Sequence, residues 1–193
     1  MARESNVVLV KVGDAGRITE RNIERGLRWV IDNRERYNIR VVSISLGGDE
    51  DVSYKTNAVD QAAEEAVNSG AVVAVAAGNS GCSEHHKPVP PANSPSVITV
   101  GGYDDWNRLE PDEIHLYCSS FGITADGIVK PDIIAAAMWI AAPILPNTPE
   151  YHRAEALSFF ASAPDYLIEG FRRRAATDIS IALWETAGLP ESL

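Results

Sequence analysis

The sequence has few cysteines, no basic surface and no long apolar run, and each of these absences excludes a class of protein. Two cysteines, Cys82 and Cys118, in 193 residues cannot form a disulfide framework, and a single bridge between them stays open. The formal net charge is -10 and the only basic run is Arg172–Arg174, which argues against a nucleic-acid partner. No apolar stretch is long enough to span a membrane, so no membrane partner is expected. The N-terminal residues do not form a signal peptide, because their apolar part is too short and Asp14 follows it, and the compartment therefore stays unassigned.

The sequence does contain a regular alternation of strand and helix patterns as far as residue 77. Apolar runs predict the strands, and apolar stripes at helical spacing predict the helices. Thr19 and Ser53 are expected to cap the two helices. This order predicts an α/β fold, a parallel sheet flanked by helices. In chain order we expect a strand at 7–12, a helix from Thr19 to about Tyr37, a strand at 41–46, a helix that stops at Gly70, a strand from Val72 and a short strand at 97–100 that ends at Gly101–Gly102.

The composition changes after Pro146, where the alternation of strands and helices does not return. Residues 150–161, 165–176 and 178–187 have helical patterns instead. We therefore expect two regions: a partial α/β domain at 1–145 and a C-terminal helical insertion or appendage at 146–193.

The stretch VVAVAAGNSG, from Val72 to Gly81, is the most informative part of the sequence. A continuous apolar run without polar alternation predicts a strand that is covered on both faces. The Gly-Asn-Ser-Gly turn follows at the carboxyl end of the strand, where open α/β sheets bind ligands. There the amide of Asn79 could donate two hydrogen bonds without the desolvation cost of a charge. Alternatively, Asn79 serves only because asparagine tolerates a left-handed turn, and this stretch alone favours that interpretation.

Five motifs follow one another along the chain, and together they resemble the middle of a subtilisin-like serine peptidase domain. The resemblance covers about residues 5–140, and it implies an incomplete form of the subtilisin-like fold. Each motif alone is too common to be informative, but their order and spacing make the set specific. The motifs are VVSISLGG at 41–48, AVDQAAEEAVNSGAVVAVAAGNSG at 58–81, SPSVITVGGYDD at 94–105, CSSFG at 118–122 and KPDIIA at 130–135.

The resemblance implies a role for two strand ends. Asn79 matches the asparagine that donates a hydrogen bond to the oxyanion, and this changes its favoured interpretation from turn residue to functional residue. The segment Ser45, Leu46 and Gly47 matches the one that pairs with extended substrate and forms one wall of the pocket for the residue before the cleaved bond. Ala77 and Gly78 match the opposite wall, where small residues leave room for a side chain.

The chain lacks the motifs that carry the catalytic Asp, His and Ser of this family. Asp14-Ala15-Gly16 superficially resembles the Asp motif, but it follows an apolar run that the family places after the His motif, so we interpret Asp14 as a turn residue. His85, His86, His115 and His152 lack the family context of the catalytic histidine.

Two other local features depart from a simple match. The loop from Cys82 to His86 has metal-binding residue types, but zinc needs three or four ligands, and the sequence favours a solvated loop without a metal. Ala136 and Ala137 stand where the family has Pro and Gly, so the turn there is expected to differ.

These observations favour a fragment of a serine endopeptidase that is inactive alone. Its expected partners are a peptide or protein substrate and the missing flanking segments of the same domain. The alternative is a non-catalytic peptide-binding module, or pseudoenzyme, on the same fold. A nucleotide-binding scaffold is disfavoured because no Gly-rich phosphate loop joins a strand to a helix. No cofactor is expected; the family often binds calcium and is often secreted, but no calcium-ligand segment can be matched here residue by residue.

Overall fold

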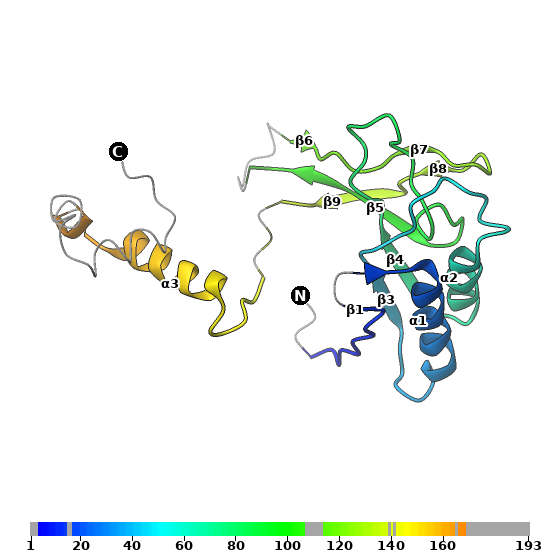
Figure 1. Cartoon of the computed structure of the whole chain (residues 1–193), viewed down its shortest axis with the longest axis horizontal. Coiled ribbons are helices and arrows are strands. Elements are labelled where there is room, and N and C mark those ends of the chain that lie inside the picture. The colour runs from blue at the N-terminus through cyan, green and yellow to red at the C-terminus, as the bar shows by residue number, and fades with distance from the viewer. Residues whose placement is uncertain are drawn as a thin grey trace. The chain divides into compact units, whose positions relative to one another are not determined.

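A computed structural model of the chain describes residues 4–14, 17–106, 114–138, 140, 142–164 and 166–168 (Figure 1). The chain divides into two compact units, Met1–Ile140 and Ala141–Leu193, and each is described by itself below. The division into a partial peptidase domain at 1–145 and a helical region at 146–193 stays a prediction.

The first unit is built on a mainly parallel sheet. Its central strands pair in the order β3–β4–β5, and β9 adds to β5 in the same direction. The prediction of an α/β fold with a parallel sheet is therefore confirmed. The strands of this sheet are β3 (Val41–Ile44), β4 (Val72–Ala76), β5 (Ile98–Asp104), β9 (Ile133–Ala136) and the short β6 (His115–Leu116), which is antiparallel to the end of β5.

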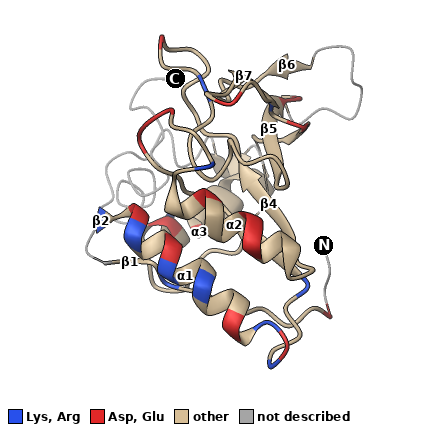
Figure 2. Ribbon diagram, turned by 90° about the vertical axis from the view of Figure 1, so that its right-hand side faces the viewer, with Lys and Arg blue, Asp and Glu red and all other residues tan. Residues whose placement is uncertain are grey.

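Helices α1 (Glu20–Asn33) and α2 (Ala58–Asn68) lie side by side and cover one face of this sheet (Figure 1). Their apolar stripes pack against every second residue of the strands, as in Val73 and Val75 of β4. Charged residues of both signs line the outer surface of the two helices (Figure 2), and Arg28 of α1 pairs with Glu65 of α2 at 2.7 Å. The core consists of Ile23, Leu27, Ile44, Val59, Ala62, Ala63, Ala66, Ala71, Val73, Val75, Ala92 and Val97.

The first predicted helix cap is confirmed and the second is wrong. Thr19 caps α1, because its hydroxyl accepts a hydrogen bond from the backbone N–H of Asn22. At α2 the cap is Asn57, whose side chain accepts hydrogen bonds from two backbone N–H groups of the first turn. Ser53 donates to Asp126 instead, a contact that no local pattern could reveal.

The helix predicted as far as Tyr37 is also too long. α1 ends at Asn33, and the chain then turns through Asn38, which has a φ of 50°. Helix α2 stops where Gly70 predicts, since Gly70 has a φ of +96° and takes up the left-handed conformation that ends helices.

The strand at Val72 is covered on one face only within the first unit, so the prediction of a strand buried on both faces is wrong. Val73 and Val75 face the helices, whereas Val72 is 49% exposed. Ile98 of β5 and Ile133 of β9 are exposed as well. Both described helices of this unit pack on the same face, and the apolar residues Val72, Ile98 and Ile133 stay exposed on the other.

Two predicted strands differ from the structure at their ends. The run at 7–12 forms no strand; its valines Val10 and Val12 pack against Gly26 of α1, and Leu9 is 90% exposed. The strand expected at 97–100 continues as β5 through Gly101 and Gly102. A Cβ on Gly102 would lie 2.5 Å from the Cβ of Ala137, so this glycine permits close packing and does not end the strand.

The remaining elements are short pairs of strands and one further helix. Strand β1 (Gly13–Asp14) pairs with β2 (Arg17–Ile18), and β7 (Gly122–Ile123) pairs with β8 (Val129–Lys130). Helix α3 (Pro149–Ser162) belongs to the second unit and matches the helix predicted at 150–161. The helices predicted at 165–176 and 178–187 lie almost entirely outside the described residues. No described helix is both long and apolar enough to cross a membrane.

A buried carboxylate on α2 connects the core to the loop before β5. Asp60 is fully buried, and its Oδ1 accepts a hydrogen bond from the hydroxyl of Ser94 at 2.6 Å. Its other oxygen has no hydrogen-bond partner among the described residues. The pKa of Asp60 is raised from 3.8 to about 6, mainly by burial and also by the nearby charges of Glu20 and Glu64, which together outweigh the lowering effect of the hydrogen bond from Ser94.

Asp60 predicts a fall in stability as the pH rises from about 4 to about 6. In this range the folded chain keeps a proton on Asp60 that the unfolded chain has lost, so the free energy of unfolding decreases with pH. Asp60→Asn is therefore expected to raise the free energy of unfolding at pH 7 by about 1–3 kcal/mol. Urea unfolding between pH 4 and pH 7 measures this, with the exposed Glu65→Gln on the same helix as the control. Equal pH profiles for Asp60→Asn and the unmodified chain would contradict the prediction.

Candidate functional site

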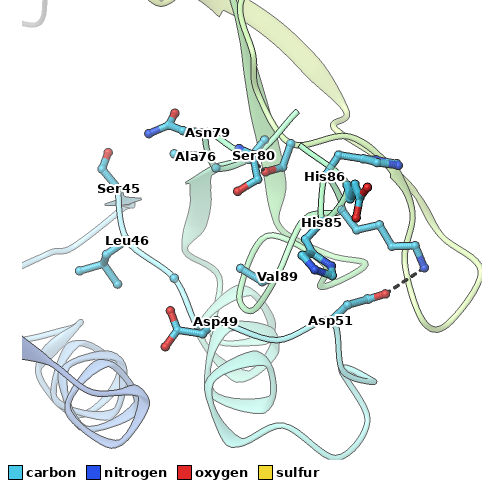
Figure 3. Close-up of a pocket in the computed structure, with 17 residues that line it drawn as sticks. Ser45, Leu46, Asp49, Asp51, Ala76, Asn79, Ser80, His85, His86 and Val89 are labelled. Atoms are coloured by element: carbon cyan, nitrogen blue, oxygen red, sulfur yellow. Dashed lines mark hydrogen bonds and ion pairs between the residues drawn. The ribbon is translucent and has the colours of Figure 1, made fainter. Parts of the chain in front are cut away.

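A cavity of about 840 Å³ lies at the carboxyl ends of β3 and β4, the edge at which parallel sheets bind their ligands. In Figure 3, Ser45 and Leu46 follow β3 on one side, and on the other side Ala76 ends β4 and Asn79 follows it. The lining consists of Ser45, Leu46, Gly47, Gly48, Asp49, Asp51, Ala76, Ala77, Gly78, Asn79, Ser80, Glu84, His85, His86, Lys87, Val89 and Ser120.

All six residues that the sequence singled out line this one cavity. They come from two segments about thirty residues apart, which the parallel pairing of Ile44 with Val75 brings together. Ser45, Leu46 and Gly47 continue β3 beyond its last residue pair with β4. Ala77, Gly78 and Asn79 form the turn after β4, and the N–H of Ala77 still donates to the carbonyl of Val100 in β5.

Asn79 is exposed, and its amide makes no hydrogen bond to any residue that the structure describes. Figure 3 shows its side chain extending away from the turn on the side of Ser45. Gly78 before it has a φ of +102°, a conformation that glycine adopts without strain. The turn thus holds a neutral amide with both N–H groups available to a ligand.

The segment 118–122 packs against the Asn79 turn. The N–H of Gly81 donates to the carbonyl of Cys118 at 2.9 Å, and the N–H of Ser120 donates to the carbonyl of Gly78 at 3.0 Å. Cys82 and Cys118 form a disulfide, the single bridge that the sequence left open. The bridge uses both thiols, so neither cysteine is a thiolate ligand in this structure. Among the described residues, no group of three or more His, Cys, Asp or Glu side chains could hold a metal ion.

The loop at 88–91 closes the cavity on the side away from Asn79. The N–H of Gly48 donates to the carbonyl of Pro90 at 2.8 Å, and the side chain of Val89 lines the cavity. A Cβ on Gly47 would lie 2.9 Å from that same carbonyl oxygen, so only glycine fits this wall without a shift of the loop. The loop therefore contributes one wall of the cavity.

Asp51 joins three loops at the polar end of the cavity. Its Oδ2 pairs with Lys87 Nζ at 2.9 Å, which is the dashed line in Figure 3. Its Oδ1 accepts a hydrogen bond from the backbone N–H of Ala125 at 3.3 Å. The loop after β3, the loop before β5 and the β7–β8 hairpin are thus connected through one carboxylate.

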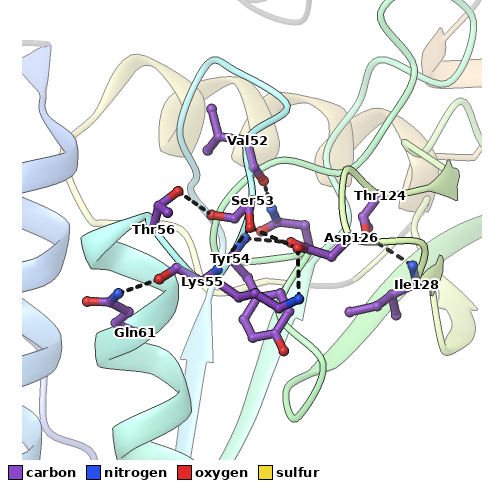
Figure 4. Close-up of polar contacts among 10 residues, drawn as sticks. Val52, Ser53, Tyr54, Lys55, Thr56, Gln61, Thr124, Asp126 and Ile128 are labelled. Carbon is purple, nitrogen blue, oxygen red and sulfur yellow. Dashed lines mark hydrogen bonds and ion pairs between the residues drawn. The ribbon is translucent and has the colours of Figure 1, made fainter.

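A second carboxylate, Asp126, fixes the chain that leaves the cavity toward α2 (Figure 4). It accepts hydrogen bonds from the hydroxyl of Ser53 at 2.8 Å and the N–H of Tyr54 at 2.9 Å, and it lies 3.6 Å from Lys55 Nζ. Desolvation raises the pKa of Asp126, but these hydrogen bonds and the charge of Lys55 outweigh that effect and hold the pKa below its usual value. The carboxylate is therefore ionised at neutral pH and holds the hairpin against the loop.

The profile of the subtilase family matches residues 1–164 of the chain. The chain belongs to the subtilase family. The resemblance stated from the five motifs is therefore confirmed.

Individual subtilases match over part of their length. The chain is 39% identical over 155 residues to serine protease AprX of Bacillus subtilis strain 168, with 76% of this chain and 35% of AprX covered. It is 36% identical over 110 residues to the cuticle-degrading serine protease of Arthrobotrys oligospora, with 56% of this chain and 25% of the relative covered. The fold matches the solved structure of S41 psychrophilic protease with a TM-score of 0.50 and 23% identity, over 65% of this chain and 41% of that one. The chain thus spans about a third of AprX and a quarter of the cuticle-degrading protease.

The four histidines of this subtilase chain lie in three different segments of the chain. His85 and His86 line the cavity, and His86 Nδ1 lies 2.9 Å from the carbonyl oxygen of Phe121, to which it can donate. His115 lies in β6, and His152 lies in α3 of the second unit. The backbone of Asp14 is in the two-residue strand β1, paired with β2.

Several cavity residues of the subtilase chain were missed by sequence reasoning. Ser120 lies inside the CSSFG motif, which was recognised only as a family marker. Asp51 stands in a run of three acidic residues, and Val89 stands among prolines. Nothing in the local sequence distinguishes these two from ordinary loop residues. At Ala136 the structure has strand, since β9 continues where the family motif has a proline.

Proposed function

We propose that this chain supplies the oxyanion donor and the substrate cleft of a subtilisin-like serine endopeptidase, and that it cleaves no peptide bond alone. The observation that supports the proposal most strongly is the free amide of Asn79 at the edge of the cavity after β4. In acyl transfer the carbonyl oxygen of the substrate becomes negative as the tetrahedral intermediate forms. A preplaced neutral donor stabilises this charge more than it stabilises the bound substrate, and therefore accelerates the reaction.

The substrate peptide is proposed to lie in extended conformation along Ser45, Leu46 and Gly47. These residues continue a strand beyond its paired part, so their backbone can pair with an added strand. The side chain before the cleaved bond then enters between this segment and the Ala77–Gly78 segment. Both walls contain glycine, which leaves room for a side chain. The bound peptide places its carbonyl carbon near Asn79, and this chemistry needs no cofactor.

The nucleophilic serine, its histidine and the aspartate are proposed to come from flanking segments of the same domain. The apolar face of the sheet that α1 and α2 leave uncovered supports this partner, because exposed apolar faces of this kind are usually contact surfaces. The coverage of about a third of AprX supports it as well. In this account the region at 146–193 is an insertion or appendage that follows the partial peptidase domain.

The alternative is a peptide-binding module that keeps the cleft and has no catalytic serine. The same cavity and the missing triad motifs favour it equally. The coding sequence on both sides of this chain distinguishes the endopeptidase from the binding module. We expect Asp-Thr-Gly and His-Gly-Thr-His motifs upstream and a Gly-Thr-Ser-x-Ala motif downstream, in one reading frame or in an adjacent one.

The experiment is to join this chain to those segments and to assay peptide hydrolysis. We define the completed chain as this sequence together with flanking segments that carry the three motifs. The completed chain is expected to hydrolyse a chromogenic peptide, and this chain alone is not. Flanks without the three motifs, or a completed chain that binds peptide without cleaving it, would favour the binding module.

A further inference from the structure

The side chain of Asn79 has no described partner that could hold it in place. Its orientation therefore depends on the backbone of the turn, residues 78–80. An oxyanion donor contributes to catalysis only when it is held within about 0.5 Å of the position where the charge develops. What fixes this turn consequently decides how well Asn79 can act.

One residue, Ser120, holds the turn on both sides of Asn79. Its backbone N–H donates to the carbonyl of Gly78 at 3.0 Å, and its hydroxyl oxygen accepts the N–H of Ser80 at 3.2 Å. A Cβ on Gly78 would lie 2.8 Å from that hydroxyl oxygen, so the serine also occupies the space beside the turn. These contacts join segments about 40 residues apart in sequence. They hold residues 78 and 80, and Asn79 lies between these two positions.

Ser120 is itself held firmly. It is 3% exposed, and the residues on each side of it are bound to other parts of the first unit. The hydroxyl of Ser119 accepts the N–H of Gly102 in β5 at 2.7 Å, and the N–H of Phe121 donates to the carbonyl of His86 at 2.8 Å. The Cys82–Cys118 disulfide ties the same segment to the chain just after the turn. The turn is therefore bound to a rigid support.

We propose that Ser120 is a positioning residue for the oxyanion donor, acting through the two backbone neighbours of Asn79. The proposal rests on the proposed role of Asn79. The hydroxyl of Ser120 fixes the peptide plane after Asn79, and its N–H fixes the carbonyl before it. Together they set the direction in which the Asn79 side chain leaves the backbone. Loss of the hydroxyl frees the N–H of Ser80 and widens the range of orientations that the Asn79 amide visits.

The first test measures the turn in this chain by NMR. In Ser120→Ala, we expect the backbone N–H of Ser80 to exchange about fivefold faster, as the loss of one hydrogen bond implies. We also expect the order parameter of the Asn79 side-chain amide to fall. Ser120→Thr keeps the hydroxyl and should restore both values.

Ser119→Ala is the matched control, because it removes a neighbouring hydroxyl that binds β5 and not the turn. It is expected to lower the melting temperature about as much as Ser120→Ala while leaving the Asn79 signal unchanged. Equal exchange at Ser80 and an equal Asn79 order parameter in the two alanine variants would overturn the positioning role.

The second test separates this proposal from the proposed function. In the completed chain, Ser120→Ala should lower kcat, leave KM nearly unchanged and add little to the effect of Asn79→Ala. If Asn79→Ala leaves kcat unchanged, the oxyanion role fails, and the positioning proposal fails with it. If Asn79→Ala lowers kcat but Ser120→Ala changes neither kcat nor the NMR signals, only the positioning proposal fails.

Discussion

Replacement of Asn79 by alanine is expected to lower kcat of the completed chain by about 10²- to 10³-fold and to leave KM almost unchanged. This magnitude is that of the corresponding asparagine in a subtilisin and is taken over from that relative. kcat falls while KM is retained because the Asn79 amide binds the carbonyl oxygen of the substrate much more strongly once that oxygen is negative. Alanine removes both N–H groups and leaves the cleft that binds the peptide intact, so substrate affinity is retained. Steady-state hydrolysis of a chromogenic peptide measures both constants.

Two controls make this result specific to the oxyanion. Asn68→Ala removes an asparagine at the end of α2, outside the cavity, and should change neither constant. Ser45→Ala alters a residue of the substrate wall without removing its backbone, and it should leave kcat within a few-fold. An unchanged kcat in Asn79→Ala would remove this residue from the mechanism and leave the chain with a peptide cleft alone.

The sequence predicted the elements whose pattern is local. Strands β3 and β4 and helices α1 and α2 follow from apolar runs and from stripes at helical spacing, and Thr19 and Gly70 from the chemistry of helix ends. The helix ends depend on contacts between near neighbours in the chain. The helices and strands depend on which side of each element carries its apolar residues. Their order along the chain was enough to predict the parallel sheet.

The end of α1 at Asn33 and the cap Asn57 are failures of the local pattern, whereas the two largest failures involve what an element packs against. The run at 7–12 has the composition of a strand, but it packs on α1 and pairs with no strand in the described part of the chain. β4 has the composition of a strand buried on both faces, yet both described helices of the first unit pack on one of them. The apolar residues on the other face of the sheet fit a surface that contacts a partner. If the proposed flanking segments cover this face in the completed chain, β4 is buried on both faces there, as its sequence predicts.

The cavity could be predicted from the sequence only in part. Ser45 and Asn79 were found because family motifs occur at two strand ends that a parallel sheet places together. Ser120 and Asp51 were not found, because their partners lie 40 and 74 residues away in sequence. A hydrogen bond over such a distance leaves no periodic signal, and a serine or aspartate in a loop usually contacts solvent.

The central claim is that this chain has an oxyanion donor and a substrate cleft but no activated serine. Activation of a serine needs a histidine base held by a third group, and the family motifs that carry this arrangement are missing. A serine without such a base does not react with a fluorophosphonate at an appreciable rate. The cavity is lined by the exposed Ser45 and Ser80, so a latent nucleophile at either residue would be accessible to the probe.

The most direct measurement is therefore labelling of the isolated, folded chain with a fluorophosphonate probe, followed by intact mass spectrometry. An active subtilisin treated in the same way is the positive control, and the unfolded chain gives the background. We expect the isolated chain to stay at the background level, while the subtilisin is labelled to one probe per molecule. Stoichiometric labelling of any serine in the isolated chain would contradict the claim, because it would show that this sequence assembles a working nucleophile by itself.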